Sequence, residues 1–424
     1  MWRTLVLIPH EFAGIPIFGF GWLLGILVIA VIARLLIAKK RDQSISELLA
    51  GEGPMWGLLA VLFAVVLPRV ELLNVDQEPV GMAIRFYGVM LVLAVSMAVA
   101  LAWYRAKRYG LNPEIILSIA PWAFIGGILG ARVFYVIQYR DQFIDDSLSE
   151  TIGNMLDFTG GGLVVYGSFI GGFLAGSVYV YRNGLPILKF GDVVVPCMFL
   201  GVFFGRIGCL MNGCCYGGAC EAHQFGAIQF PANSPVYFDQ LRSGKLLGFS
   251  YDAKTRRITS VREGSLAASE GVEQGGSLQT LSDDLTPRET ASREIPVEEV
   301  RTGVVATIDG KRHRWSPAQL PAKAQPVFAA QLLSSGCALV LCLLLLGLSK
   351  LPFRSGAVMM MGFAGYAVLR FVLELVRVDE GGQFGTSLSI SQWVSVFVLV
   401  GSFIGLWWIY RSTPSPDVQA QPTQ

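Results

Sequence analysis

Charged residues are scarce in this chain of 424 residues. Asp, Glu, Lys and Arg make up 15% of it, and hydrophobic residues make up 53%. A soluble domain has about 25% charged residues, so the composition excludes an ordinary soluble protein and indicates a membrane protein. The net charge of +2 gives no indication of a nucleic-acid partner, and we expect none.

Histidine is also rare. The three histidines, His10, His223 and His313, lie outside the long apolar runs, so the membrane segments offer no histidine as a base or metal ligand. No cleavable signal peptide is evident, because residues 1–11 hold one basic residue and no small-residue cleavage site follows the first apolar run. We expect that run to be kept as a helix.

Nine apolar runs of spanning length or close to it follow one another along the chain. Basic residues come after alternate runs, and the first two intervening loops are mainly acidic. By the positive-inside rule, this pattern predicts an all-α, multi-pass membrane protein with its N-terminus outside and its C-terminus in the cytoplasm. The second run is short enough for a half-buried or re-entrant segment. The runs are 12–33, 53–68, 86–104, 115–137, 158–181, 193–213, 324–349, 355–376 and 383–410.

Residues 218–325 interrupt this pattern with a polar stretch between two outward-facing helix ends, long enough for a small domain. Alternation of apolar and polar residues predicts strands at 257–261 and 304–308, and Asp309-Gly310 is a hairpin turn signal. Residues 258–278 resemble, loosely, the strand, helix and turn of a PDZ domain. We therefore expect a small β-containing extracytoplasmic insertion.

Glycines recur inside the apolar runs, as in Gly126-Gly127-x-x-Gly130 and Gly167-x-x-x-Gly171-Gly172. Such spacing allows helix backbones to approach closely, and packing alone explains most of these glycines. Gly167 also follows Tyr166, where absent side chains leave room for a ligand head group. For Tyr87 and Tyr166, the alternative is the aromatic belt at the membrane interface.

Three arginines, Arg132, Arg206 and Arg370, stand inside apolar runs. A guanidinium keeps its proton, and placing one in a membrane costs at least ~2.5 kcal/mol, so such residues usually face a cavity, a partner or a substrate. A cluster of buried arginines suits a lipid phosphate. For Arg206 the alternative is snorkelling to lipid phosphates, but its neighbours are glycines and polar residues. Asn212, further along, is placed to hydrogen-bond a phosphate or a glycerol hydroxyl.

Arg370, Glu374 and Arg377 follow i, i+4, i+7 spacing, which puts them on one face of a helix. An internal salt bridge is the alternative to substrate binding, yet two arginines against one glutamate leave a net positive site. Arg132 has two equally supported roles. It either binds a lipid head group or supports the fold by pairing with a helix carbonyl or with Asp157.

Four of the seven cysteines, Cys209, Cys214, Cys215 and Cys220, cluster at the predicted outer end of a helix. Their spacing does not match the usual zinc pattern of Cys-x2–4-Cys pairs. An adjacent cysteine pair cannot bind one ion without strain. The spacing therefore favours packing or a disulfide over a metal, and no metal is expected.

These residues together resemble the prolipoprotein diacylglyceryl transferases of the bacterial inner membrane. The resemblance covers 81–231 and 326–410. The family signature Gly-Arg-x-Gly-Asn-x-x-Asn-Gly-Glu-x-x-Gly is similar to the stretch from Gly205 through Arg206 and Asn212 to Gly217. Further matches are Tyr87-Gly88, Gly130-Ala131-Arg132, Gly161-Gly162-Leu163 through Tyr166-Gly167 to Gly171, Gln331-Leu332, and Arg370-Phe371-x-x-Glu374-x-x-Arg377.

The chain departs from the family pattern at several positions. Tyr166 stands where the family has histidine, Cys209 replaces an asparagine, and Cys214 replaces the signature glutamate. Gln331-Leu332 is followed by Leu333-Ser334 where Tyr-Glu is usual. These departures leave the identity of the catalytic base open.

The resemblance implies transfer of the diacylglyceryl group of phosphatidylglycerol to the lipobox cysteine of a prolipoprotein signal peptide. It implies catalytic roles for Arg206, Arg370, Tyr166 and Glu374, and no cofactor. Substrate binding falls to Tyr87, Arg132, Gly167, Asn212, Gly217 and Arg377. The alternatives are a non-catalytic lipid-binding or transport protein of the same fold, and a homologue whose outer domain is the working part.

The expected architecture is a seven-helix core, two additional N-terminal helices and the outer insertion. The parts are the N-terminal extension at 1–80, the core at 81–217 and 326–411, the insertion at 218–325, and a disordered tail at 412–424, which is rich in Pro, Gln and Ser.

Overall fold

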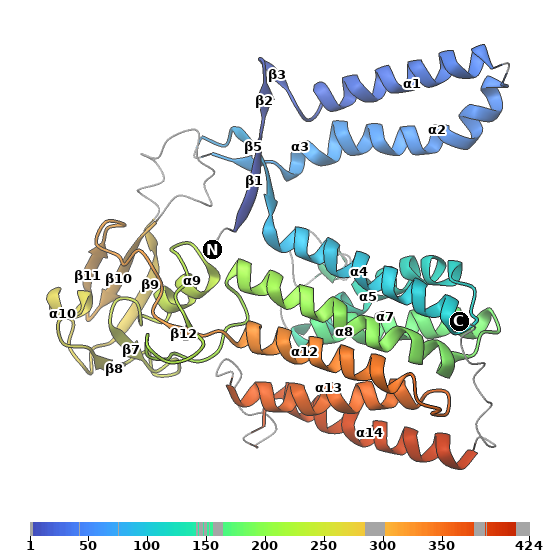
Figure 1. The fold of residues 1–424 in the computed structure, drawn as a ribbon. Helices are drawn as coiled ribbons and strands as arrows, with labels where there is room; N and C mark the ends of the chain where they lie inside the picture. Colours follow the sequence, from blue (N-terminus) through green and yellow to red (C-terminus); the bar gives the residue numbers. More distant parts are fainter. Residues whose placement is uncertain are drawn as a thin grey trace. The chain divides into compact units, whose positions relative to one another are not determined.

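The computed structural model describes residues 3–41, 43–74, 76–140, 143, 147, 151, 153–155, 164–284, 302–376, 386 and 388–412. The chain forms two compact units, each built from two separate segments (Figure 1). Unit 1 consists of Met1–Val89 and Gly208–Ala329, and unit 2 of Met90–Ile207 and Ala330–Gln424. The N-terminal segment and the insertion therefore belong to one unit. The five-part division of the sequence stays a prediction.

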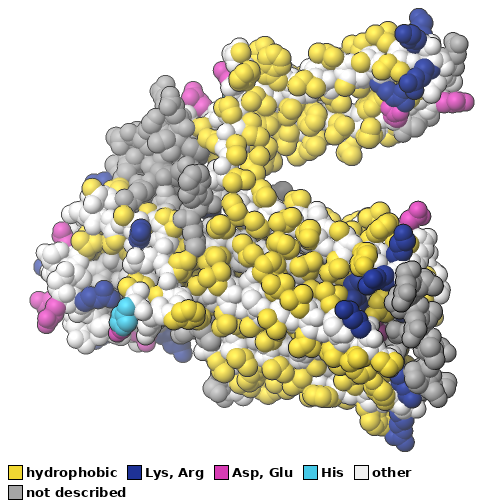
Figure 2. Space-filling model, in the orientation of Figure 1, with side chains coloured by type: hydrophobic (Ala, Val, Ile, Leu, Met, Phe, Trp, Pro, Cys, Tyr) yellow, Lys and Arg dark blue, Asp and Glu magenta, His cyan; other side chains and the backbone are white. Residues whose placement is uncertain are grey.

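Among the described residues, eight helices are long and apolar enough to cross a membrane. This confirms an all-α, multi-pass membrane protein. On the face drawn in Figure 2, hydrophobic side chains cover the helices and charged side chains gather near helix ends. The eight are α1 (Trp22–Lys40), Glu52–Val70, α4 (Phe86–Arg108), α5 (Glu114–Gln138), α8 (Ile187–Asn212), α12 (Ala330–Leu348), α13 (Ala357–Val376) and α14 (Ile390–Ser412).

The predicted runs 53–68 and 158–181 both correspond to helices. The first belongs to a continuous helical stretch made of α2 (Ile45–Val61), a π-helical turn (Leu62–Val66) and α3 (Leu67–Val70), so its shortness in the sequence does not limit the helix. The second corresponds to α7 (Val165–Arg182), and its first residues, 158–163, lie outside the described residues.

A small antiparallel sheet in unit 1 was not predicted. Strand β1 (Thr4–Pro9) pairs with β5 (Pro79–Arg85), and β5 pairs with β4 (Leu72–Leu73). A short hairpin, β2 (Glu11–Phe12) with β3 (Ile15–Pro16), leads into α1. Strand β1 reads TLVLIP, and a continuous apolar run carries no alternation from which a strand can be told from a helix.

The insertion in unit 1 contains the predicted strands β8 (Ile258–Val261) and β10 (Gly303–Ile308). Asp309 and Gly310 both have positive φ and connect β10 to β11 (Lys311–Trp315), which confirms the hairpin. Strand β10 also pairs with β9 (Leu278–Asp284). The other elements here are β6 (Ala227–Ile228), α9 (Pro235–Arg242), β7 (Phe249–Tyr251), α10 (Leu266–Ser269) and β12 (Val327–Phe328).

One hydrophobic core holds the insertion together. Its fully buried members include Trp315, Phe249 and Leu247, and Leu210 from the last turns of α8 joins the same cluster. The end of α8 is therefore fixed to the insertion by burial of apolar surface. The likeness of 258–278 to a PDZ domain stays a prediction beyond its strand and its helix.

In unit 2, glycines bring α5 and α7 into backbone contact. A Cβ atom added at Gly130 would overlap the carbonyl oxygen of Gly167, and one added at Gly167 would overlap that of Gly130. Gly126 meets Gly171 in the same way. The predicted close approach of two helices through small residues is confirmed.

This contact generates a stability prediction. Gly130→Ala should lower the thermal midpoint of the purified protein, because the added methyl meets backbone that cannot move aside, and overpacking of this kind costs about 1–3 kcal/mol. Gly176→Ala is the matched control on α7, since its Cβ would lie 3.6 Å from Ile119 Cδ1, an ordinary contact. Equal midpoints for the two variants would contradict the close contact.

Candidate functional site

A buried carboxylate joins α8 to α13. Asp192, in α8, is 2% exposed, and its oxygens accept hydrogen bonds from the backbone N–H groups of Gly356 (2.6 Å) and Met359 (2.7 Å). These amides lie at the N-terminus of α13, where the first N–H groups have no partner within the helix and the helix dipole favours negative charge. Asp192 therefore caps α13 from a neighbouring helix.

Helices α8 and α13 continue side by side in the same direction. Val195 and Phe199 of α8 meet Gly362 of α13, and the rings of Phe199 and Tyr366 lie 5.8 Å apart. These pairs advance together along both helices from Asp192, so the helices are parallel (Figure 1).

This register brings the two predicted arginines to a similar level. Arg206 comes seven residues after Phe199, and Arg370 comes four residues after Tyr366. At a rise of 1.5 Å per residue, they stand about 10 Å and 6 Å beyond the ring contact. Spacings of four and seven also keep a residue on the same helix face. Regular helix geometry therefore predicts that Arg206 and Arg370 lie on the facing sides of α8 and α13.

Arg370 is held by the protein. Its Nη1 donates to Glu374, and its Nη2 donates to Ser391 Oγ of α14 at 2.8 Å. Glu374 is 6% exposed, and its second oxygen accepts a hydrogen bond from Ser389 Oγ at 3.2 Å. The internal salt bridge weighed above is present, and both oxygens of Glu374 are engaged. Arg377 lies outside the described residues.

Arg206 differs from Arg370. It is partly buried in α8, and no residue in the described part of the chain accepts a hydrogen bond from its guanidinium or forms an ion pair with it. A charged group in an apolar helix needs a counter-charge. Among the residues that the structure describes, Arg206 therefore has no counter-charge.

Arg132 serves the fold. It is 6% exposed, and it donates from Nε to the Met155 carbonyl (2.9 Å) and from Nη2 to the Asn154 carbonyl (2.7 Å). Its guanidinium also lies 5.5 Å from the ring centre of Tyr135 and 5.3 Å from that of Phe143. Of its two predicted roles, pairing with carbonyls is the one observed. Asp157, its other predicted partner, lies outside the described residues.

Arg105 has a structural role that the sequence did not reveal, because it directly follows the apolar run 86–104, where the positive-inside rule already accounts for a basic residue. It is 5% exposed and donates to the carbonyls of Val193 (3.0 Å) and Asp192 (2.8 Å) and to Ser349 Oγ (3.1 Å). Arg105 thereby joins α4 to α8 and to the end of α12. A basic residue at the end of an apolar run fits topology equally well, so only the fold reveals this role.

Packing accounts for two glycines predicted to bind substrate. Gly167 lies in the α5–α7 contact, and the N–H of Gly217 donates to the Phe328 carbonyl at 2.8 Å, where a side chain would crowd Phe328. Tyr87 is 41% exposed near the start of α4. Tyr166 belongs to α7, and its side chain lies outside the described residues.

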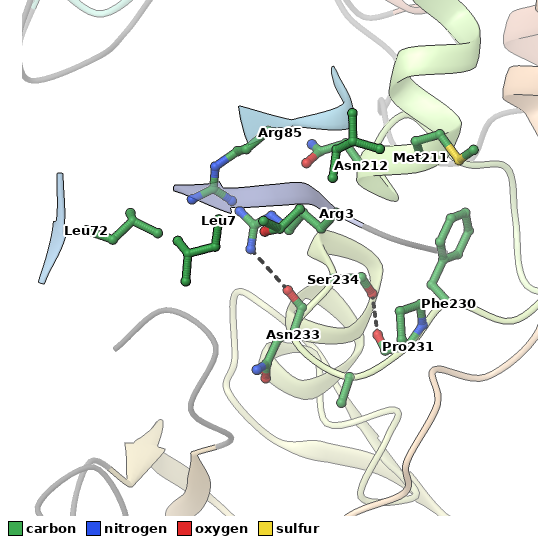
Figure 3. Close-up of a pocket in the computed structure, with 13 residues that line it drawn as sticks. Arg3, Leu7, Leu72, Arg85, Met211, Asn212, Phe230, Pro231, Asn233 and Ser234 are labelled. Carbon is green, nitrogen blue, oxygen red and sulfur yellow. Dashed lines mark hydrogen bonds between the residues drawn. The ribbon is translucent and has the colours of Figure 1, made fainter. Parts of the chain in front are cut away.

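Asn212, the last residue of α8, lines a cavity of about 490 Å³ in unit 1 (Figure 3). Arg3 and Arg85 line the same cavity, and Arg3 Nη1 donates to the Asn233 carbonyl at 3.3 Å. Arg85 stands opposite Thr4 in the β1–β5 pair, which explains how two arginines far apart in sequence meet. Two guanidiniums and an amide suit an anionic group. The sequence pattern pointed to Asn212 but not to Arg3 or Arg85.

Three cysteine thiols lie together at the same end of α8. The sulfur atoms of Cys209, Cys214 and Cys215 are all within 4.8 Å of one another. All seven cysteines are described, and no disulfide joins any two of them. Cys220 is outside the group.

The chain matches the family model of prolipoprotein diacylglyceryl transferase over residues 78–408. It is 45% identical to the phosphatidylglycerol–prolipoprotein diacylglyceryl transferase of Rhodopirellula baltica, with 99% of this chain and 91% of the relative covered. The enzymes of the same name from Clostridium tetani and Thermus thermophilus are 39% and 36% identical. The match to the Clostridium tetani enzyme spans 33% of this chain and 54% of that enzyme, and the match to the Thermus thermophilus enzyme spans 31% of this chain and 46% of that enzyme.

The cap supplied by Asp192 generates a prediction. Asp192→Ala should lower the thermal midpoint, because it removes a buried acceptor from two N–H groups, and each unsatisfied group costs about 1–3 kcal/mol. Glu114→Gln is the control, since Glu114 is an exposed acid in the first turn of α5. A midpoint for Asp192→Ala equal to that of the control would mean that α13 does not depend on this cap.

Proposed function

This chain belongs to the prolipoprotein diacylglyceryl transferase family, and we propose that it transfers the diacylglyceryl group of phosphatidylglycerol to the lipobox cysteine thiol of prolipoprotein signal peptides. It is a multi-pass membrane transferase of lipoprotein biosynthesis. We propose the bacterial inner membrane as its location, from its membership of the family. The distribution of basic residues supports an N-terminus outside.

The contact of Phe199 with Tyr366 supports the assignment of the site. From that contact, regular helical rise would bring Arg206 and Arg370 to similar levels on two parallel helices. Arg370 is already oriented by Glu374 and Ser391, whereas the described residues offer Arg206 no counter-charge. A lipid phosphate between them would neutralise Arg206 and accept hydrogen bonds from both guanidiniums.

The arrangement suits the chemistry of the transfer. The thiolate of the substrate attacks the glycerol carbon that bears the phosphate, and the C–O bond breaks as the C–S bond forms. Negative charge then grows on the leaving glycerol phosphate. Fixed positive charges in a site of low dielectric stabilise that charge without reorganising. Arg206 and Arg370 supply such charges. Asn212 stays a proposed participant from the resemblance of its motif.

The remaining predicted residues divide into supporting and binding roles. Arg132, Gly167 and Gly217 support the fold through the contacts described above. Glu374 orients Arg370 and is poorly suited to be a base, because both of its oxygens accept hydrogen bonds. Tyr87, Tyr166 and Arg377 stay proposed participants from the resemblance of their motifs.

The two arginines should differ when replaced. Arg206→Ala should lower the transfer rate about 10²–10³-fold and leave the thermal midpoint near that of the unmodified protein, because no described partner loses a contact. Arg370→Ala should lower both, since it leaves Glu374 buried without its cation, which costs about 3–5 kcal/mol. Transfer is measured with phosphatidylglycerol vesicles and a lipobox peptide.

Two controls separate chemistry from folding. Arg108→Ala removes an exposed arginine of α4 and should change neither quantity. Arg370→Leu combined with Glu374→Leu removes both charges, so the midpoint should recover while transfer stays low. Full transfer by Arg206→Ala or by the double variant would contradict the assignment of these arginines to the lipid phosphate.

A conservative change tests the role of Glu374. Glu374→Gln keeps an oxygen to orient Arg370, so we expect transfer to fall by less than about tenfold and its pH profile to stay in place, whereas a general base contributes about 10²–10⁴-fold. The measurement is the transfer rate between pH 5.5 and 8.5. A loss greater than a hundredfold with an unchanged thermal midpoint would make Glu374 the base instead.

A further inference from the structure

The three neighbouring thiols are held in place by the backbone around them. Helix α8 ends at Asn212, Gly213 has φ +77°, and the N–H groups of Gly213 and Cys214 both donate to the Cys209 carbonyl, at 2.9 and 3.1 Å. The chain therefore folds back over Cys209 directly after the helix. Val236 N–H donates to the Gly213 carbonyl at 3.2 Å, which ties this turn to the insertion.

Adjacent cysteines normally point apart, so from the sequence alone Cys214 and Cys215 are not expected to bind one metal ion without strain. Cys215 has φ +58°, a left-handed conformation that is uncommon for residues other than glycine and is often found at functional sites. With this conformation both thiols of the adjacent pair reach Cys209. The strained backbone conformation that binding of one ion by both cysteines would require is thus already present at Cys215.

Three mutually close thiols suit a soft metal ion better than a disulfide, which needs only two. Thiolates select zinc and copper(I) among the common ions. Zinc binds sulfur at 2.3 Å, so the sulfur atoms around one tetrahedral ion lie about 3.8 Å apart. The three sulfur atoms lie within 4.8 Å of one another, a range that includes this spacing. Three protein ligands leave a fourth position open, as in catalytic zinc sites.

Among the described residues, the one candidate base does not meet the chemical requirement of the proposed transfer. The transfer needs a thiolate, and the candidate carboxylate Glu374 is engaged by Arg370 and Ser389. The three histidines lie outside the membrane runs. A thiol bound to a zinc ion loses its proton outright, so a metal centre can do what a base would do. Cys209 stands three residues after Arg206 in α8.

We propose that Cys209, Cys214 and Cys215 bind one zinc ion as thiolates, and that the lipobox thiol takes the fourth position and is activated there. This inference rests on the proposed function. The substrate thiol replaces a bound water and gives its proton to solvent. The bound sulfur then forms the C–S bond as the C–O bond breaks, and the electron pair leaves with glycerol phosphate. The uncharged thioether binds zinc weakly, and water replaces it.

The first measurement is the metal content of the full-length protein purified in detergent without chelator. We expect elemental mass spectrometry to find one zinc ion per chain. The variant combining Cys209→Ser, Cys214→Ser and Cys215→Ser should bind none, and Cys220→Ser, which removes a nearby cysteine outside the cluster, should keep it. Equal zinc in the triple variant and the unmodified protein, or a disulfide between two of the three cysteines in protein without zinc, would overturn the proposal.

The second measurement asks whether the substrate thiol reaches the ion. In protein loaded with cobalt(II) in place of zinc, the thiolate-to-metal absorption band should increase when a lipobox peptide is added. It should not change with the same peptide carrying serine for cysteine. If the absorption band did not change when the cysteine peptide was added, the ion would have a structural role only, and the activation step would be overturned.

The third measurement is transfer after removal and return of zinc. At pH 6.5 a free thiol of pKa about 8.5 is about 1% ionised, so zinc-free protein should transfer about a hundredfold more slowly. It should recover when zinc returns or as the pH approaches 8.5. Full activity without zinc at pH 6.5 would overturn the inference alone. Absence of transfer in every sample would count against the proposed function, while the metal content and the cobalt spectrum would still decide the inference.

Discussion

The register between α8 and α13 is the constraint on which the site depends. Asp192 caps α13 through the amides of Gly356 and Met359, and the contact of Phe199 with Tyr366 continues the same alignment along the helices. Arg105 adds hydrogen bonds to the carbonyls of Asp192 and Val193. A buried carboxylate therefore fixes the helices at one end, and regular helical rise brings Arg206 and Arg370 to similar levels further along.

The hydrogen-bond partners of the arginines in the membrane helices distinguish those that support the fold from those proposed to bind substrate. Arg105 and Arg132 are buried and donate hydrogen bonds to backbone carbonyl oxygens. Lipid tails could not donate hydrogen bonds to these oxygens. Arg370 combines orientation by Glu374 with a position beside the proposed phosphate. Arg206 has no counter-charge among the described residues. The same side chain thus supports the fold in two places and is available to a ligand in another.

Much of this could be read from the sequence because its signals are local. Length and hydropathy predicted the membrane helices, glycine spacing predicted the α5–α7 contact, and Asp309-Gly310 predicted the hairpin between β10 and β11. The spacing of Arg370 and Glu374 raised an ion pair as the alternative to substrate binding, and that pair is present. The roles of Arg105 and Arg3 and the strand β1 were missed, and the predicted cluster of four cysteines was not narrowed to Cys209, Cys214 and Cys215. Each depends on chain segments that meet only after folding or on a backbone angle that sequence does not reveal.

In the proposed site, two guanidiniums from parallel helices hold one lipid phosphate. An experimental structure of the protein with bound phosphatidylglycerol would reveal where the phosphate lies. We expect it between Arg206 and Arg370, with an N–H donor of each at about 2.7–2.9 Å from a phosphate oxygen. A head group bound elsewhere, with these two side chains pointing into separate surroundings, would contradict it.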